Sequence, residues 1–600
     1  MSSMLKDPDL ISLQEVRSKV ENAYAAWQKY RSYSQEQVDA LVERVASVAR
    51  ANARRLAELA VEETGYGNAR DKLAKNLLAS DVLPRAMRGL KTIGVLREVP
   101  EQKIVEIGVP MGVVAAILPT TNPTSTAIYK TLISLKAGNA IVLSPHPRAK
   151  VCTCETATIL RQAALQAGAP EGLVECVFNA TIDGTSALMK HPRTGVILST
   201  GGSGIVRAAY SSGKPAFGVG PGNVPVLIDK SADVAEAVGK VVDGKSFDFG
   251  TVCSSEQAIV GERGLQEGII AALKGRRAFI CDARQTEALA RLLVTPSFGI
   301  NPDCVGQAPG KIAKMAGFDV PADTSILVVE IQGVGKEHPL SAEKLSPVLS
   351  LYFVADFAAA LHGCEAILRF GGLGHTCVIH AKDDARIREF AMRMPAFRVL
   401  ANTSSPQGST GITTNVFPAM TLGCGAVAGN ITSDNIGPLN LINIKRLAYV
   451  ARKAEEAFEN PEISGAAGAV DRGNVVAAVE RYLAKRGVAA APQLTASPDL
   501  TSASDLTASV VDRFLAAKRG MGVGSPAPAA RPESPASAVT PLEISDFVCE
   551  DDVRRAIAQS KKIYIGPGSI VTPSARDLAL RDDTLVMTEH VKARKKGASE

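Results

Sequence analysis

The sequence has little excess charge, and this and other absences exclude several classes of protein. Its net charge is only +6 over 600 residues, with no dense basic block before residues 592–597, so we expect no nucleic-acid partner. No run of residues approaches the roughly 20 apolar positions that span a bilayer. The first seven residues lack the apolar core of a signal peptide. We therefore expect a soluble, intracellular protein without a membrane partner.

Cysteine and histidine are sparse and scattered. The chain has 10 cysteines and 7 histidines, and no histidines show metal-ligand spacing. The close pair Cys152 and Cys154 falls in a predicted helix without a second pair nearby, so we expect packing there rather than zinc binding. Free thiols without a disulfide framework are typical of a reducing compartment. We expect no metal site.

The hydrophobic pattern indicates helices first, then alternating strands and helices. Apolar residues three and four positions apart predict helices over 16–30 and 35–61, the second opened by a capping box at 34–37. From Gly108, alternation implies parallel sheets covered on both faces, with ligands at the carboxyl ends of the strands. The first block has predicted strands at 113–118, 140–143, 173–178 and 195–198, and helices at 124–135, 149–166 and 205–211. The second has strands at 224–229, 257–260, 278–281 and 325–330, and a helix at 265–273.

Two polar residues indicate acyl chemistry. Asn122 stands where an apolar strand gives way to a helix, and Cys253 follows a glycine-containing turn. A thiol nucleophile and a carboxamide donor are the two groups needed to hold a carbonyl as a tetrahedral adduct. An isolated cysteine is more often a buried packing residue, and the presence of Asn122 favours the catalytic interpretation. We expect the two to meet across an interdomain cleft.

A glycine-rich turn at 199–204 ends one predicted strand and opens a helix. Its small residues would let a pyrophosphate approach the N–H groups at the helix start. The order of residues is not Gly-x-Gly-x-x-Gly, so this turn alone is a weak signal for a nucleotide.

The composition changes from residue 490 to Ala, Pro, Ser and Thr, which is typical of a tether. Within it, residues 504–519 predict one short amphipathic helix, whose apolar stripe must dock on something because so short a helix is marginal alone. The surface that receives it is either the protein's own core or a partner. Flanking tethers favour a partner.

Six segments in order resemble the CoA-acylating aldehyde dehydrogenases, of the type associated with bacterial microcompartments: residues 119–130, 144–150, 218–225, 250–253, 371–376 and 422–425. The resemblance runs from about residue 10 to 485. It implies an α/β fold with a Rossmann-like cofactor domain, an α/β catalytic domain, a small oligomerisation element and a largely flexible C-terminal extension. The expected divisions are 1–226 (helices and cofactor domain), 227–414 (catalytic domain), 415–489 (return and oligomerisation segment), 490–540 (tether and helix) and 541–600 (tail).

The resemblance implies a mechanism with Cys253 as the nucleophile that attacks the aldehyde. Asn122 and the backbone N–H of Cys253 would stabilise the oxyanion, and hydride transfer to a nicotinamide would leave a thioester. Hydrolytic relatives activate water with a glutamate in a Glu-Leu-Gly-Gly-Lys segment, whereas residues 218–225 here contain no carboxylate. CoA is therefore expected to take the acyl group. A hydrolytic enzyme and a catalytically silent, shell-organising scaffold are the alternatives.

The resemblance also implies cofactor-binding residues, with NAD expected and NADP possible. Ser144 stands where hydrolytic relatives commonly have a lysine, which leaves the choice of cofactor open. Glu343 matches the glutamate that holds the nicotinamide ribose, or is a solvated loop charge. His375 would help to deprotonate CoA at its ordinary pKa of about 6.5, or makes a structural hydrogen bond. The complete cofactor set is Thr120, Ser144, His146, Gly201, Gly202, Ser203, Gly220, Glu343 and Pro347.

Residues 548–557 and 562–578 resemble tail segments of microcompartment proteins, and 504–519 resembles an encapsulation peptide. The resemblance thus implies a location in the microcompartment lumen, or otherwise the cytoplasm, with shell or cargo proteins as partners. A homodimer or homotetramer is expected. The substrate would be a short-chain aldehyde of the acetaldehyde or propionaldehyde class, and the sequence does not distinguish among them.

Overall fold

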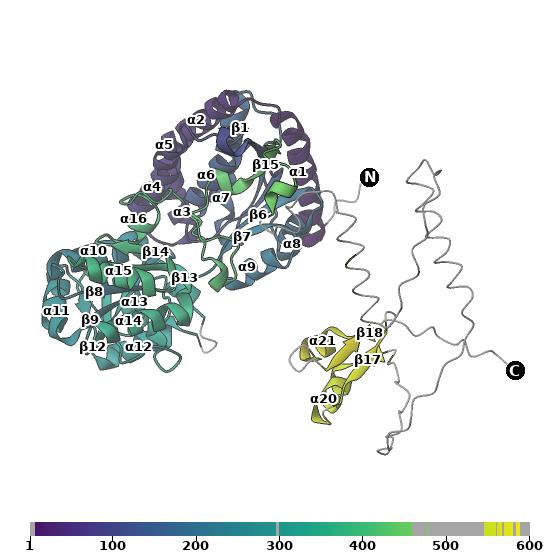
Figure 1. The fold of residues 1–600 in the computed structure, drawn as a ribbon. Helices are drawn as coiled ribbons and strands as arrows, with labels where there is room; N and C mark the ends of the chain where they lie inside the picture. The colour runs from purple at the N-terminus through teal and green to yellow at the C-terminus, as the bar shows by residue number, and fades with distance from the viewer. Residues whose placement is uncertain are drawn as a thin grey trace, which may run out of the picture. The chain divides into compact units, whose positions relative to one another are not determined.

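The computed structural model describes residues 6–295 and 299–458, residue 477, and most of 545–587, without 546, 560, 567–568 and 580–583. The chain divides into two compact units, residues 1–468 and 469–600 (Figure 1). The predicted tether and the helix at 504–519 lie outside the described residues.

Unit 1 begins with helices, as predicted: α1 (Pro8–Tyr30), α2 (Gln35–Ala51), α3 (Ala53–Thr64) and α4 (Ala69–Leu77). The capping box of α2 is confirmed, because the Gln37 N–H donates to the Ser34 hydroxyl at 3.3 Å and the Ser34 N–H donates to Gln37 Oε1 at 2.8 Å. The single helix predicted over 35–61 is wrong in one respect. The backbone at Asn52 leaves the helical region (φ −96°, ψ 0°) and separates α2 from α3.

A five-stranded parallel sheet follows, in the order β5-β4-β3-β6-β7. All residues of β3 and β4 are buried, as expected of strands covered on both faces. The strands are β3 (Val113–Ile117), β4 (Ala140–Ser144), β5 (Val174–Cys176), β6 (Thr194–Thr200) and β7 (Ala216–Val219). The connecting helices are α6 (Pro123–Lys136), α7 (Lys150–Gln166), α8 (Ile182–Lys190) and α9 (Ser203–Tyr210).

The second sheet has seven parallel strands in the order β10-β11-β12-β9-β8-β13-β14. Its strands are β8 (Val224–Ile228), β9 (Glu256–Glu262), β10 (Phe279–Ile280), β11 (Leu327–Glu330), β12 (Val348–Val354), β13 (Gly374–His380) and β14 (Ala396–Ala401). Its longer helices are α10 (Val234–Ser246), α11 (Gln266–Gly275), α12 (Ala283–Leu293), α14 (Phe357–Ile367) and α15 (Asp384–Arg393). Because β8 starts at Val224, a domain boundary at 226 falls inside this strand.

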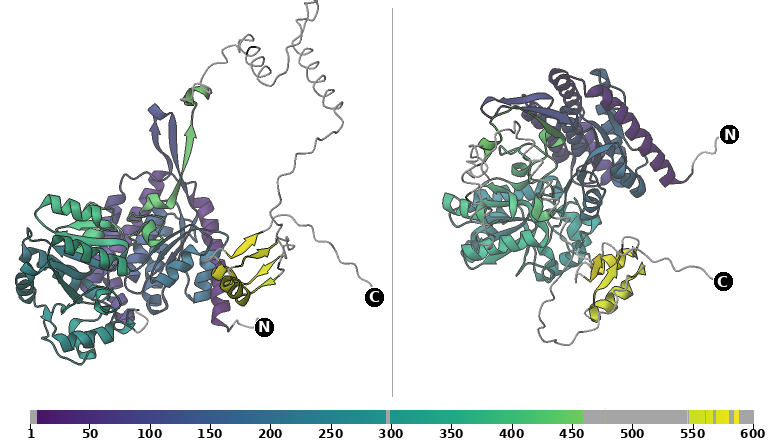
Figure 2. Two further views of the ribbon diagram at one scale, coloured as in Figure 1. Left: turned by 60° about the horizontal axis from the view of Figure 1, so that its bottom comes forward. Right: turned by 45° about the vertical axis from the view of Figure 1, so that its right-hand side comes forward.

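An antiparallel sheet of β1 (Gly94–Val99), β2 (Ile104–Pro110) and β15 (Ile442–Ala448) projects from unit 1 (Figure 2). The chain thus returns to the first sheet's side after the catalytic domain. Two bonds hold the returning segment there: the Tyr129 hydroxyl donates to the Ile436 carbonyl at 2.6 Å, and Asn139 Nδ2 donates to the Leu441 carbonyl at 2.9 Å. Beyond Ile442, the residues of β15 are exposed.

Unit 2 answers a question that the sequence left open, since the described tail residues are folded. β16 (Phe547–Val548) pairs with β18 (Ile570–Val571), and β17 (Ile563–Ile565) pairs with β19 (Leu585–Met587), each in parallel. Helices α20 (Glu550–Ala558) and α21 (Pro573–Ala579) pack with these strands. The expected α/β class is confirmed. Among the described helices of both units, none has the length and apolarity required to cross a bilayer.

A buried lysine supports the strand ends at which ligands are expected. Lys130 is fully buried and its Nζ donates to the carbonyls of Ile117 (2.6 Å) and Leu198 (2.9 Å), near the carboxyl ends of β3 and β6. Burial holds its pKa well below the ordinary lysine value.

We expect Lys130→Met to lower the melting temperature, because each carbonyl left without a donor costs about 1–3 kcal/mol. The matched control is Thr131→Val at the neighbouring buried position, whose hydroxyl has no hydrogen-bond partner among the described residues. Calorimetry should show a clear loss for the first variant and none for the second. Equal melting temperatures for Lys130→Met and the parent would contradict this role.

Candidate active site

A cavity of about 980 Å³ lies at the carboxyl ends of β3, β4, β6 and β7 and includes the turn that carries Cys253. The predicted meeting of Asn122 and Cys253 in one cleft is seen here. Most of the predicted cofactor residues also line it: Thr120, Ser144, His146, Gly201, Gly202, Ser203, Gly220 and Glu343. In the described part of the chain, Pro347 and His375 are not among the lining residues.

The glycine-rich turn forms one wall of the cavity. Gly202 is the N-cap of α9 and Ser203 its first residue, so the free N–H groups of this helix start adjoin the cavity. Nothing lies within 4 Å of where a Gly202 side chain would begin. This wall can accept a phosphate group. Among the described residues, no group of three or more His, Cys, Asp or Glu side chains could hold a metal ion.

Ser144 and His146 lie at the end of β4 on the same cavity. The Ser144 hydroxyl is 3.1 Å from the Thr185 hydroxyl, and His146 Nδ1 accepts from the Arg148 N–H at 3.1 Å. Partial burial and the Arg148 charge lower the pKa of His146. Since Glu343 is the one carboxylate in the described lining, this end carries no acidic group that would repel a phosphorylated ribose.

Asn122 is the N-cap of α6, but its side chain does not cap that helix. Instead, Lys75 Nζ donates to Asn122 Oδ1, and Asn122 Nδ2 donates to the Thr121 hydroxyl at 3.1 Å. The carboxamide is therefore oriented by a residue from the N-terminal helices rather than by its own helix.

Cys253 follows a turn in the left-handed backbone region, with φ of 47° at Asp248, 50° at Phe249 and 72° at Gly250. A side chain at Gly250 would begin 2.6 Å from the Ser346 carbonyl oxygen, so glycine is required there. The turn ends in Thr251, Val252 and Cys253, which line the cavity. Cys253 is partly exposed there.

The cavity keeps the Cys253 thiol protonated. Burial raises the pKa of Cys253 to about 12, and the neighbouring Glu343 contributes to the increase. Glu343 is itself 8% exposed, so it is not a solvated loop charge. Burial raises its pKa to about 8, although the Gly222 N–H donates to Glu343 Oε1 at 3.2 Å.

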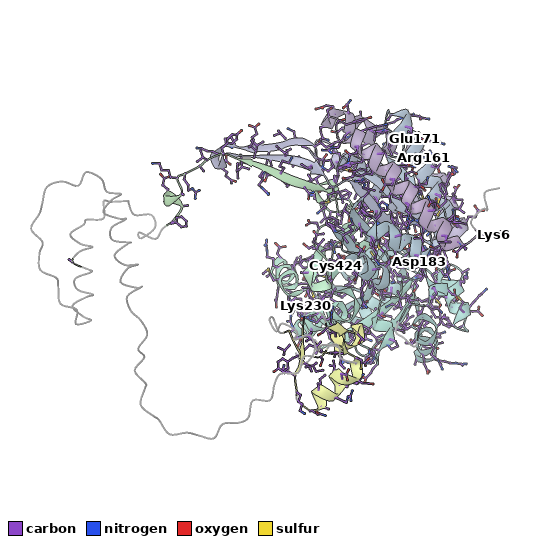
Figure 3. All side chains as sticks on the ribbon, turned by 90° about the vertical axis from the view of Figure 1, so that its right-hand side faces the viewer. Lys6, Arg161, Glu171, Asp183, Lys230 and Cys424 are labelled. Carbon is purple, nitrogen blue, oxygen red and sulfur yellow. The ribbon has the colours of Figure 1, made fainter. Side chains whose placement is uncertain are left out.

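A second thiol and a buried arginine lie near Cys253. Cys424 is buried (labelled in Figure 3) and also raises the pKa of Cys253, whereas Arg398 lowers it. Arg398 donates to the carbonyls of Gly423 at 2.5 Å and Ser433 at 3.1 Å. These bonds hold the loop that includes Cys424 against β14.

His375 is buried against Gly222 and is not among the described residues that line the cavity. A side chain at Gly222 would begin 2.2 Å from the Cys253 carbonyl oxygen and 3.1 Å from His375 Cγ, so the Cys253 backbone and the His375 ring both pack closely against Gly222. Burial, with a contribution from Arg398, lowers the pKa of His375 to about 3. Deprotonation of CoA by His375 was inferred from an ordinary histidine pKa, which the buried ring does not retain. Its role stays a prediction.

Pro347 and the close cysteine pair, which the sequence analysis also singled out, lie outside the cavity wall. Pro347 precedes β12, and its carbonyl accepts from the Leu327 N–H at 2.8 Å, so it belongs to the pairing of β11 with β12 inside the second sheet. Cys152 and Cys154 are buried in α7, as expected of packing residues.

The sequence analysis missed Lys75 and Asp248, which are both buried behind Asn122. The sequence gives only a weak signal for this pair, because two lysines three residues apart on a helix, here Lys72 and Lys75, normally indicate a solvated face.

Comparison with known proteins identifies the family of the chain. The profile of the aldehyde dehydrogenase family matches residues 3–280. An acetylating aldehyde dehydrogenase from Geobacillus thermoglucosidasius is 47% identical, with a TM-score of 0.74, and the match covers 75% of this chain and 99% of that one. The chain belongs to the aldehyde dehydrogenase family.

Other relatives differ in length and in what they bind. The bifunctional aldehyde-alcohol dehydrogenase of Escherichia coli K12 is 42% identical over 447 residues, which are 74% of this chain but 50% of that protein. The chain therefore spans about half the length of this curated relative. A Rhodopseudomonas palustris propionaldehyde dehydrogenase with bound propionyl-CoA is 29% identical (TM-score 0.67, covering 72% of this chain and 94% of that one). A propionaldehyde dehydrogenase from the fucose utilisation microcompartment of Clostridium phytofermentans is 27% identical (TM-score 0.66, 72% and 97%).

The high pKa of Cys253 predicts an unusual dependence of its alkylation on pH. Only the thiolate reacts, so with a pKa of about 12 the rate in the unliganded enzyme should rise about tenfold per pH unit from pH 7 to 10. An ordinary thiol such as glutathione, the control, should level off above about pH 9. Mass spectrometry of the peptide that contains Cys253 after timed iodoacetamide treatment measures the rate. A plateau of the alkylation rate at or below pH 9 would contradict the high pKa of Cys253.

Proposed function

We propose that this protein oxidises a short-chain aldehyde to an acyl-CoA, with NAD or NADP as hydride acceptor. The observation that carries the proposal is that Asn122 and Cys253, from separate α/β domains, line one cavity together with the N-terminus of α9. A thiol and a carboxamide donor serve carbonyl chemistry, and the helix start suits a dinucleotide phosphate. The acetylating aldehyde dehydrogenase of Geobacillus thermoglucosidasius and the propionaldehyde dehydrogenase with bound propionyl-CoA support this reaction class.

In the first step the Cys253 thiol loses its proton to solvent water, and the resulting thiolate sulfur attacks the aldehyde carbon. The negative charge that develops on the carbonyl oxygen is stabilised by Asn122 Nδ2 and the backbone N–H of Cys253. The nicotinamide, when bound, supplies the acceptor for the hydride that leaves the substrate carbon. Loss of that hydride re-forms the carbonyl and leaves a thioester on Cys253. The CoA sulfur then takes the acyl group, and Cys253 departs as the free thiol.

The nature of the second nucleophile distinguishes this proposal from the hydrolytic alternative. Gly220 and Pro221 line the cavity, and the stretch 218–225 has no carboxylate to activate water. Thiols are intrinsically better nucleophiles than water and need less activation. The bound propionyl-CoA in the Rhodopseudomonas palustris relative also favours CoA. A silent scaffold would not require the thiol and the carboxamide to share a cavity.

The location and the partners are a further part of the proposal. We infer that the protein is cargo of a bacterial microcompartment, attached through residues 504–519, and that it is a homodimer or homotetramer. The amphipathic pattern of that segment and the microcompartment relative support packaging. The exposed residues of β15 supply strand surface for self-association.

Cys253→Ala tests the chemistry. We expect this variant to lose CoA-dependent reduction of NAD by several orders of magnitude while it still binds the cofactor, because the sulfur acts only in the covalent step. The parent enzyme with aldehyde and NAD but no CoA should accumulate an acyl adduct on Cys253, detectable by mass spectrometry. Rapid multiple-turnover release of free acid without CoA would favour the hydrolytic alternative.

Deletion of the residues after 490 tests packaging. The shortened chain should keep its activity and lose co-purification with shells. The apolar stripe of the predicted helix consists of Leu506, Val510, Val511, Phe514 and Leu515, so Phe514→Asp, which places a charge in it, should cause the same loss. Asp512→Asn, off that stripe, is the control and should remain packaged. Unchanged shell association after deletion would refute the packaging proposal.

A further inference from the structure

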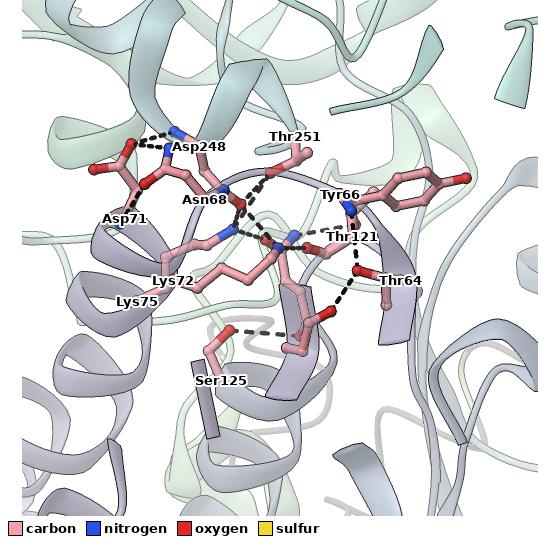
Figure 4. Close-up of polar contacts among 12 residues, drawn as sticks. Thr64, Tyr66, Asn68, Asp71, Lys72, Lys75, Thr121, Ser125, Asp248 and Thr251 are labelled. Carbon is pink, nitrogen blue, oxygen red and sulfur yellow. Dashed lines mark hydrogen bonds and ion pairs between the residues drawn. The ribbon is translucent and has the colours of Figure 1, made fainter. Parts of the chain in front are cut away.

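A buried polar cluster, whose members Lys72, Lys75 and Asp248 are labelled in Figure 4, contacts Asn122 through Lys75 and takes no part in the steps above. It joins Lys72 and Lys75 of α4 to Asp248, five residues before Cys253. The side chains of these lysines are 2% and 4% exposed, and that of Asp248 is 0% exposed. Charges at this depth are costly unless each is paired and hydrogen-bonded.

Asp248 satisfies this condition with both carboxylate oxygens. Its Oδ2 accepts from Lys75 Nζ, from Lys72 Nζ at 3.1 Å and from the Thr251 hydroxyl at 2.6 Å. Its Oδ1 accepts from the Asn68 N–H at 2.8 Å. The pocket is closely fitted, because a side chain at Gly67 would begin 1.9 Å from Oδ1.

Lys75 extends this cluster to the proposed oxyanion donor. Its ammonium contacts Asp248 Oδ2 on one side and Asn122 Oδ1 on the other, with the Thr251 hydroxyl at 3.3 Å. An ammonium has hydrogens to donate and no acceptor, so it can bind only the oxygen end of the carboxamide. The Nδ2 end, which has the N–H groups that an oxyanion requires, is thereby turned away from Lys75.

We propose that Lys75 is a positioning residue, which fixes the orientation of the Asn122 carboxamide, and that Asp248 holds the Lys75 ammonium in the core. The inference rests on the proposed function of Asn122 as oxyanion donor. Without Lys75, the carboxamide could rotate so that either its NH₂ group or its oxygen faces the substrate. In the second orientation the oxygen would repel the negative charge that develops on the substrate carbonyl.

Asp248 also explains how the donor and the nucleophile are kept in register. It precedes Cys253 in the same turn, whereas Lys75 and Asn122 belong to the N-terminal helices and the first sheet. The Asp248 N–H donates to Asp71 Oδ2 at 2.8 Å, which adds a second link between α4 and the turn. Burial lowers the pKa of Lys75 to about 8, and Asp248 opposes that decrease. Loss of Asp248 would leave an unpaired buried ammonium, which would give up its proton.

A double-mutant cycle tests the inference, with kcat and KM measured for aldehyde oxidation with NAD and CoA. Asn122→Ala alone should lower kcat by about 10²–10³, as expected for loss of one oxyanion donor. Lys75→Met should lower kcat roughly 10- to 100-fold with little change in the KM for NAD. Added to Asn122→Ala, Lys75→Met should change kcat less than about threefold, because there is no carboxamide left to orient.

Two further variants separate positioning from a purely structural role. Lys75→Gln keeps an N–H donor and should retain more of kcat than Lys75→Met. Lys136→Met is the matched control, a buried lysine paired with Asp39 away from the cavity, and should leave kcat unchanged in both backgrounds. If Lys75→Met does not fold, as judged by calorimetry, the cycle is run with Lys75→Gln.

The size of the loss caused by the Lys75 substitution in the two backgrounds distinguishes the possible roles of Lys75. Equal fold losses for Lys75→Met (or its Lys75→Gln substitute) in the parent and Asn122→Ala backgrounds would overturn the positioning role and leave the proposed function intact. An Asn122→Ala rate within threefold of the parent would overturn the proposed role of Asn122 and this inference with it. A strongly reduced loss in the Asn122→Ala background supports both.

Discussion

The ion pair between Asp248 and Lys75 is the interaction on which the geometry of the site depends. It lies where α4, the Asn122 loop and the Cys253 turn come together, and none of these elements is adjacent to another in sequence. A buried carboxylate without its cations would cost several kcal/mol. The pairing requires α4 and the Cys253 turn to be in place, and the bond from Lys75 to Asn122 adds the Asn122 loop. The cluster therefore couples the geometry of the candidate site to the packing of the two α/β domains.

The two ionisable groups beside each other in the cavity, Cys253 and Glu343, both favour their neutral forms. A thiol with a pKa of about 12 and a carboxyl with a pKa of about 8 are both mainly protonated at neutral pH. Each disfavours ionisation of the other, because two neighbouring anions repel in a desolvated space. The Cys253 thiol is therefore mainly neutral in the unliganded protein. The same logic explains why His375, buried beside Arg398, stays neutral.

Much of the fold could be predicted because the central strands of both sheets, such as β3, β4 and β8, are buried on two faces. Such strands are continuous apolar runs, and the predicted runs coincide with β3, β4, β6, β8 and β9 to within one or two residues. The break at Asn52 was not predicted, since its neighbours keep the helical spacing of apolar residues. Whether the tail beyond 541 folds stayed open, because the small apolar core that its described residues form, with Val548, Val553 and Ile565, is dispersed among charged residues.

The sequence by itself indicated acyl chemistry. Asn122 at a strand-to-helix turn and Cys253 after a glycine turn are local patterns, but the two residues adjoin different sheets and meet only because the two α/β domains pack together. Only the tertiary structure decided how these groups are tuned. The orientation of Asn122 depends on Lys75, and the ionisation of Cys253 depends on Glu343, Cys424 and Arg398, all remote in sequence. Desolvation and charge pairing act over a few ångströms in space, so no pattern along the chain could reveal them.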